Sequence, residues 1–154
     1  LIQESVDQLV DVLKERFGIS SSKFKVMGHS LGAAVALDTA MRHGIQQGIV
    51  IAPFTTIREM GERGFGKVLP RLLSEKWSNR ESLAALAESG DCEFHIIHGT
   101  SDEVIPVAMG ETLAEEFPEI TKLSTVSGAD HSGILLQLSK ELGKALTNGG
   151  RLEL

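Results

Sequence analysis

The 154-residue chain is poor in cysteine, with Cys92 alone. One cysteine cannot form a disulfide within the chain, so no oxidising compartment is required and we expect a cytoplasmic location. Cys92 itself is interpreted as a small, partly buried apolar residue rather than a nucleophile. Long apolar runs are also missing, because stretches such as residues 48–52 are far too short to span a bilayer. The residues from Leu1 onward show no basic segment followed by an apolar one, and so no signal-peptide pattern.

Basic residues are in the minority. Fifteen Lys and Arg stand against 21 Asp and Glu, which gives a net charge of −6, and no basic run interrupts this balance. Nucleic acid or an anionic membrane surface is therefore excluded as the main partner. Residues 28–32 contain two glycines but lack the glycine spacing and the lysine of a phosphate-binding loop. We accordingly expect no nucleotide, no other cofactor and no metal.

What is present is the composition of a globular protein, with 42% hydrophobic and 23% charged residues, in a length that fits one domain over residues 1–154. Short apolar runs typical of strands cover residues 24–27, 48–52, 94–98 and 123–126. Apolar residues at helical spacing occupy residues 1–17, 31–43, 106–117 and 134–146. This alternation predicts an α/β fold: a parallel, doubly wound sheet of about four strands with crossover helices.

Residues 53–90 differ from the other connections between strands. Pro53, Pro70 and several glycines divide this segment into short helical pieces. Its large apolar residues outnumber what one crossover helix needs, which predicts a small helical insertion that caps a hydrophobic pocket. The alternative interpretation is that these residues simply complete the core.

The segment Gly28-His29-Ser30-Leu31-Gly32 lies between a predicted strand and a predicted helix. A serine in such a turn has a strained backbone that holds its hydroxyl clear of the sheet, and we expect both flanking glycines to prevent collisions there. The helix N-terminus would direct free N–H groups at the reacting centre. The alternative is an ordinary turn in which Ser30 caps the helix.

A serine nucleophile requires a base, and His131 is the candidate among five histidines. It lies between the last strand and the last helix, and in a parallel sheet such turns share one edge with the Ser30 turn. The other histidines have structural interpretations: His29 points away from the serine, His43 is a solvated helix end, and His95 and His98 are packed within a strand.

An acidic partner for His131 is expected on the same edge. Asp102 follows the strand at residues 94–98 directly, so the topology places it there. Asp130 and Glu103 are alternatives, although Asp130 is adjacent to His131 and is therefore awkwardly placed to orient its ring.

The chain order Ser30, Asp102, His131 is that of the α/β-hydrolases. Three segments resemble that family: residues 28–32, residues 98–106 (His-Gly-Thr-Ser-Asp-Glu-Val-Ile-Pro) and residues 128–131 (Gly-Ala-Asp-His). The resemblance extends over nearly the whole chain, and the middle segment is its most telling part.

This resemblance implies a serine hydrolase that cleaves a carboxylic ester or thioester through an acyl-enzyme. Ser30 would be the nucleophile, His131 the base and Asp102 its orienting partner, with the Leu31 N–H as an oxyanion donor. Phe54 and His29 are candidates for contact with the small-molecule acyl substrate.

The sequence departs from the family upstream of Ser30, where further strands and a loop with the second oxyanion donor are expected. The chain is interpreted as the C-terminal portion of an α/β-hydrolase fold, which its Leu1 start favours. A complete short variant or an inactive remnant would also account for the missing strands. Strand 24–27 would then be a sheet edge, open to a homodimer. The rival function is a non-catalytic binding or dimerisation module that lacks a complete oxyanion hole.

Overall fold

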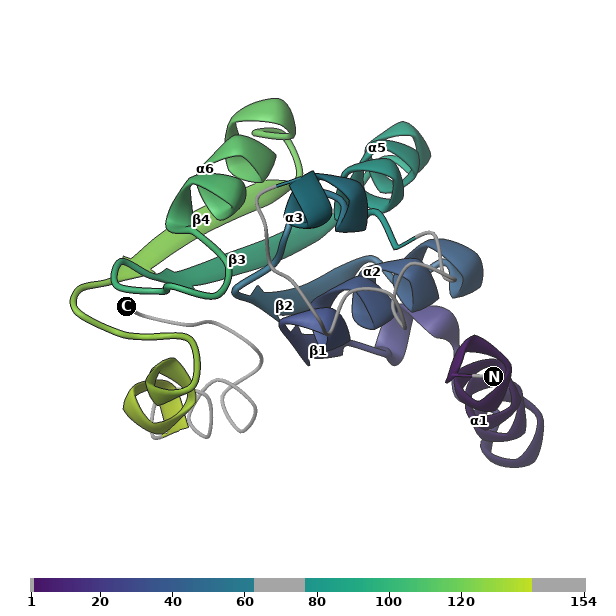
Figure 1. Cartoon of the computed structure of the whole chain (residues 1–154). Coiled ribbons are helices and arrows are strands. Elements are labelled where there is room, and N and C mark those ends of the chain that lie inside the picture. The colour runs from purple at the N-terminus through teal and green to yellow at the C-terminus, as the bar shows by residue number, and fades with distance from the viewer. Residues whose placement is uncertain (1, 63–76, 140–154) are drawn as a thin grey trace.

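A computed structural model describes residues 2–62 and 77–139. A four-stranded, fully parallel sheet forms its centre, with the strands in the order β1-β2-β3-β4 (Figure 1). The strands are β1 (Val26–His29), β2 (Gln47–Ile51), β3 (Glu93–Gly99) and β4 (Thr121–Val126). The helices are α1 (Ile2–Phe17), α2 (Leu31–His43), α3 (Ile57–Glu62), α5 (Asn79–Ser89) and α6 (Val107–Glu116), and a short 3-10 turn, η1, covers Ser21–Lys23. The predicted α/β class and parallel sheet are confirmed.

Both faces of the sheet carry a core, because alternate strand residues point to opposite sides. On one face, Val50, Phe94 and Ile96 pack against helices α2, α5 and α6. On the other face, Ile51 and Ile97 pack against residues 129–138, which follow β4 and include helical turns from residue 133. Burial on two faces explains why these strands are continuous apolar runs.

Strand β1 lies at the edge of the sheet formed by the described residues and pairs with β2. It begins two residues later than the sequence predicted and runs to His29, directly before Ser30. Met27 on this strand is 50% exposed. The edge position predicted from the order of the elements is therefore present, with an exposed apolar side chain on it.

Helix α1 packs against α2 through polar contacts. Asp7 accepts a hydrogen bond from Nε2 of His43 at 2.6 Å and pairs with Arg42, which also donates from Nε to Asp38 at 2.8 Å. The bond from His43 lowers the pKa of Asp7. The side chain of His43 is only 10% exposed, so the prediction of a solvated helix end was wrong. Arg42 in the last turn of α2 suits the helix dipole, and Asp7 of α1 supplies an acidic partner for it.

The described part of the 53–90 segment belongs to the core. Phe54, Ile57, Met60 and Trp77 are buried and pack with Ala34, Ile105 and Met109. Asn79 is fully buried and donates from its amide to the Phe54 carbonyl at 2.7 Å, which fixes the start of the segment to α5. In this part the core interpretation holds. Residues 63–76 lie outside the described residues, and a cap there stays a prediction.

Candidate active site

Ser30 occupies a sharp turn between β1 and α2. Its backbone has φ 58° and ψ −122°, a region that a non-glycine residue rarely adopts and that costs about 1–3 kcal/mol. Its side chain makes no capping hydrogen bond to α2, so the alternative of a simple helix cap does not hold. The hydroxyl is therefore left for another partner.

The two glycines of the turn have different roles. A Cβ on Gly28 would lie 2.0 Å from the carbonyl oxygen of Gly32, so only glycine fits there. A Cβ on Gly32 would meet nothing within 4 Å. The expectation that both glycines prevent collisions is correct for Gly28 and wrong for Gly32. Gly32 lies within the first turn of α2, where the backbone already faces open space.

Ser30 and His131 are brought together although 101 positions of sequence separate them. Nε2 of His131 lies 3.0 Å from Oγ of Ser30, and its Nδ1 lies 2.7 Å from Oδ2 of Asp102. Because a carboxylate only accepts, Nδ1 carries the proton that is donated to Asp102, and Nε2 then accepts the Ser30 hydroxyl proton. The three side chains come from the loops after β1, β3 and β4, which open at the same edge of the parallel sheet.

The Asp102 carboxylate is held in place by backbone contacts that do not involve His131. Its side chain is 1% exposed, and Oδ1 accepts hydrogen bonds from the backbone N–H groups of Val104 and Ile105 at 2.9 and 2.8 Å. This leaves Oδ2 for the histidine. Of the three acids considered from the sequence, Asp102 is the one that the structure places on His131.

The two alternative acids, Asp130 and Glu103, do not contact the ring of His131 through any hydrogen bond of the described residues. Oδ1 of Asp130 accepts from the N–H groups of Ser132 and Gly133 at 3.1 and 2.6 Å, which caps the helical turn that follows. The side chain of Glu103 is exposed. Although Asp130 is adjacent to His131 in the chain, its Oδ1 is directed to these backbone amides, which agrees with the expectation that it is awkwardly placed to orient the imidazole of His131.

His98 is hydrogen-bonded to the loop that carries Asp102. It is fully buried, and its Nε2–H donates to the carbonyl of Ile105 at 2.8 Å. Burial lowers the pKa of His98, which keeps the ring neutral. A Cβ on Gly110 would lie 2.5 Å from its Nδ1, so the ring fits only beside a glycine. The sequence indicated a packed histidine here, but its bond to the Asp102 loop was missed. The one available signal was its place at the strand end.

His29 lies against His131 rather than pointing away from the site. Its Nε2 is 2.8 Å from the backbone carbonyl of His131, and the two ring centroids are 4.7 Å apart at an interplanar angle of 40°. Burial lowers the pKa of His29. Phe54, the other residue expected to contact substrate, is 3% exposed and packs in the core. Phe54 therefore presents no open face to a ligand, whereas His29 is partly exposed.

Leu31 is the first residue of α2 and is partly buried. Its N–H belongs to the first turn, where backbone donors have no partner within the helix. The N-terminus of α2 thus presents partial positive charge beside Oγ of Ser30, which suits a developing oxyanion.

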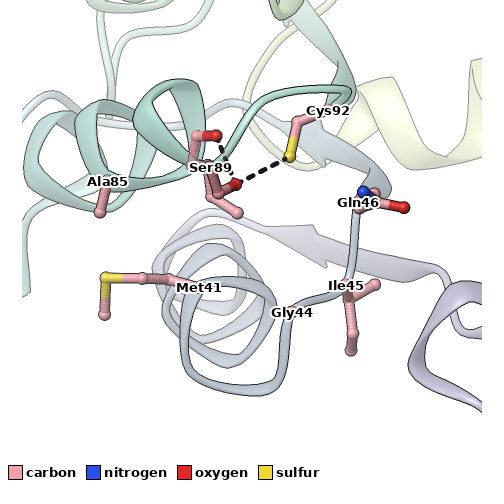
Figure 2. Close-up of a pocket in the computed structure, with 8 residues that line it drawn as sticks. Met41, Gly44, Ile45, Gln46, Ala85, Ser89 and Cys92 are labelled. Atoms are coloured by element: carbon pink, nitrogen blue, oxygen red, sulfur yellow. Dashed lines mark hydrogen bonds between the residues drawn. The ribbon is translucent and has the colours of Figure 1, made fainter.

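A pocket at the opposite edge of the sheet is unrelated to these residues. Figure 2 shows it between the end of α2, at Met41 and Gly44, and the end of α5, at Ser89, with Cys92 beside it. The Cys92 thiol is buried, as expected, and lies 3.6 Å from the Ser89 hydroxyl. Among residues 2–62 and 77–139, no cluster of His, Cys, Asp and Glu is arranged to hold a metal ion. No helix in that part of the chain is long and apolar enough to cross a membrane.

Comparison with known proteins identifies the fold. No protein-family model matches the chain. An uncharacterized protein of Mycobacterium tuberculosis is 27% identical over 115 residues, which cover 74% of this chain and 40% of that protein. The α/β-hydrolase domain-containing protein aho-3 of Caenorhabditis elegans is 25% identical over 126 residues, 82% of this chain and 36% of that protein. An esterase of Pyrococcus furiosus superposes with a TM-score of 0.71 at 18% identity, over 94% of this chain and 58% of the esterase chain.

The chain therefore has the fold of the α/β-hydrolase superfamily, and the resemblance carried by its three motifs is confirmed at that level. It spans 36–40% of the length of these two curated relatives.

Proposed function

We propose that the protein is a serine hydrolase that cleaves a carboxylic ester or thioester. Ser30 is the nucleophile, His131 the general base and Asp102 the residue that orients it. The observation that carries this proposal is the hydrogen-bonded series Ser30 Oγ, His131 Nε2, His131 Nδ1, Asp102 Oδ2, with distances of 3.0 and 2.7 Å. A serine with a strained backbone and no capping role supports the same assignment.

In the proposed reaction, Oγ of Ser30 attacks the carbonyl carbon of the substrate while its proton passes to Nε2 of His131. The Leu31 N–H stabilises the oxyanion of the tetrahedral intermediate. The bond to the leaving oxygen or sulfur then breaks, and His131 returns the proton to the leaving alcohol or thiol. Water repeats the sequence on the acyl-enzyme and releases the acid. Asp102 stays ionised throughout and stabilises the imidazolium.

An apolar acyl or alcohol group is the substrate class that we favour. The partly buried Leu31, which directly follows the serine, supports this preference, because it packs on a buried apolar cluster that includes Phe54 and Ile105. An apolar lining beside a reacting serine binds apolar groups and excludes water from the acyl-enzyme. A cytoplasmic location is part of the proposal, supported by the single unpaired Cys92.

The test is covalent labelling of the intact protein with a fluorophosphonate, followed by mass spectrometry of the modified peptide. We expect the adduct on Ser30, no labelling of Ser30→Ala, and a loss of esterase turnover of about 10⁶-fold in that variant. Ser20→Ala, which changes an exposed serine outside the turn, is the matched control and should label normally. A protein that labels elsewhere, or not at all, would contradict the proposal.

A non-catalytic dimerisation module is the second candidate, favoured by the edge strand β1 and the half-exposed Met27. In that case two copies would pair along β1 and bury the edge. Analytical ultracentrifugation separates the candidates: a monomer with ester turnover rules out the module, whereas a tight dimer without labelling at Ser30 favours it.

A further inference from the structure

The position of His131 depends on the loop that follows β4. Two hydrogen bonds tie the first part of this loop to the neighbouring acidic loop: the Gly128 N–H donates to the side-chain Oγ1 of Thr100 at 2.9 Å, and the Ser101 N–H donates to the Ala129 carbonyl at 3.0 Å. Asp130 then bonds to amides of its own turn. These contacts hold the loop to β3, and none of them reaches the strand end that carries Ser30.

His29 links the backbone of this loop to the strand end before Ser30. Its Nε2–H donates to the backbone carbonyl of His131 at 2.8 Å, across 102 positions of sequence. His29 is the last residue of β1 and immediately precedes Ser30, so the bond joins the backbone of the base to the strand end of the nucleophile. Movement of the His131 backbone away from His29 would change the distance between Oγ of Ser30 and Nε2 of His131.

The charge state of His29 suits this contact. Donation from Nε2 to a carbonyl leaves Nδ1 unprotonated in the neutral ring, and burial keeps the ring neutral by lowering its pKa. The titratable groups that face it are His131 and Asp102. Because His131 becomes an imidazolium during the proposed reaction, a neutral ring 4.7 Å from it avoids repulsion between like charges.

We infer that His29 is a positioning residue: its Nε2–H holds the backbone of His131 at the distance from Ser30 that proton transfer requires. This inference rests on the proposed hydrolase function. Nε2 of His29 is occupied by the carbonyl of His131, and contact of the rest of the ring with substrate stays a prediction. Effective catalysis depends on such placement, since a displacement near 1 Å is enough to reduce the rate about 100-fold.

A pair of amide variants tests the bond by its reach. The amide nitrogen of His29→Gln can occupy the position of Nε2, whereas that of His29→Asn is one methylene shorter and cannot reach the carbonyl. With p-nitrophenyl acetate as the probe ester, we expect His29→Asn to lower kcat at least about 10-fold at an unchanged KM, and His29→Gln to stay within about 3-fold of the parent protein. His95→Asn is the control, because His95 bonds to Ser124 within the sheet and lies outside the site.

Other results would overturn the inference. A raised KM at constant kcat in both variants would return His29 to substrate binding. Equal kcat for His29→Asn and the parent would remove its positioning role, and equal losses in both variants would show that the hydrogen bond is not the cause.

Hydrogen exchange gives a readout that does not depend on activity. In His29→Asn, the amides of Ser132 and Gly133 should exchange faster than in the parent, with slow exchange restored in His29→Gln. If the parent protein neither turns over nor labels at Ser30, the hydrolase proposal fails, while the exchange result still shows whether His29 anchors the loop. If the parent labels and the exchange rates are all equal, the positioning inference alone fails.

Discussion

Asp102 and Asp130 flank the same histidine but are used differently. Asp102 offers one carboxylate oxygen to two backbone amides and the other to Nδ1 of His131. Asp130 directs its Oδ1 to the start of the next helical turn. At the scale of single residues, the backbone N–H groups around each carboxylate determine its role. They leave Oδ2 of Asp102 to bond to His131, whereas they hold Asp130 at the start of a helical turn.

This difference predicts opposite phenotypes for the two acids. Asp102→Asn should lower kcat/KM by about 10⁴-fold, because an amide facing Nδ1 favours the wrong tautomer of His131. Asp130→Ala should retain most activity and lower the free energy of unfolding by about 0.5–2 kcal/mol, the usual cost of losing a helix cap. Steady-state kinetics and urea titration measure the two effects. Near-normal activity of Asp102→Asn would make Asp130 or Glu103 the acid instead.

How far the sequence predicts the site follows from what each residue depends on. The meeting of Ser30, Asp102 and His131 could be predicted because strand ends of a parallel sheet share one edge, which is a property of topology. The contacts of His29 and His98 could not, because they depend on where a ring nitrogen meets a particular carbonyl of a distant loop. The expectation for Gly32 was wrong because the path of the backbone places the Gly32 carbonyl against Gly28 and leaves the position of a Gly32 side chain open. The motif itself does not specify which of its two glycines is crowded.

At the scale of elements, α1 shows that an apolar stripe does not always face the core. The helix was correctly predicted from its spacing, yet Val10 is its one buried residue in the described structure. Leu9 and Phe17 are 58% and 68% exposed, whereas Asp7 faces α2 through Arg42 and His43. Periodicity identifies a helix but does not state which of its faces meets a neighbour, since ion pairs can decide the docking.

Neighbouring positions on α1 therefore differ in their contribution to stability. Val10→Ala should lower the free energy of unfolding by about 1–2 kcal/mol, because it removes buried methyl groups. Leu9→Ala, its exposed neighbour, should change it by no more than about 0.5 kcal/mol. Urea titration of both variants checks the contrast. An equal loss in Leu9→Ala would mean that this face of α1 is covered in the intact protein.

At the scale of the whole molecule, histidine burial makes stability depend on pH. His29, His95 and His98 lie in two different strands, and for each of them burial is the main cause that lowers the pKa below 6.5. Below about pH 6.5 the unfolded chain therefore binds more protons than the folded one. The free energy of unfolding should be greatest above that pH and should fall as the pH drops toward the folded-state pKa values. The lowered pKa of Asp7 acts only below its ordinary value of 3.8, outside this range.

Urea titrations at about pH 7.5 and pH 5.5 test this expectation, with a lower midpoint at the acidic pH. His95→Gln supplies the matched variant, because its amide can still bond to Ser124 but does not titrate. The gap between the two midpoints should narrow in His95→Gln by the share that His95 contributes. His95 also lies away from the Ser30–His131 pair, so the same variant should leave ester turnover at the higher pH unchanged. A midpoint that is equal at both pH values in the parent protein would show that the three rings protonate as readily in the folded chain as in the unfolded one.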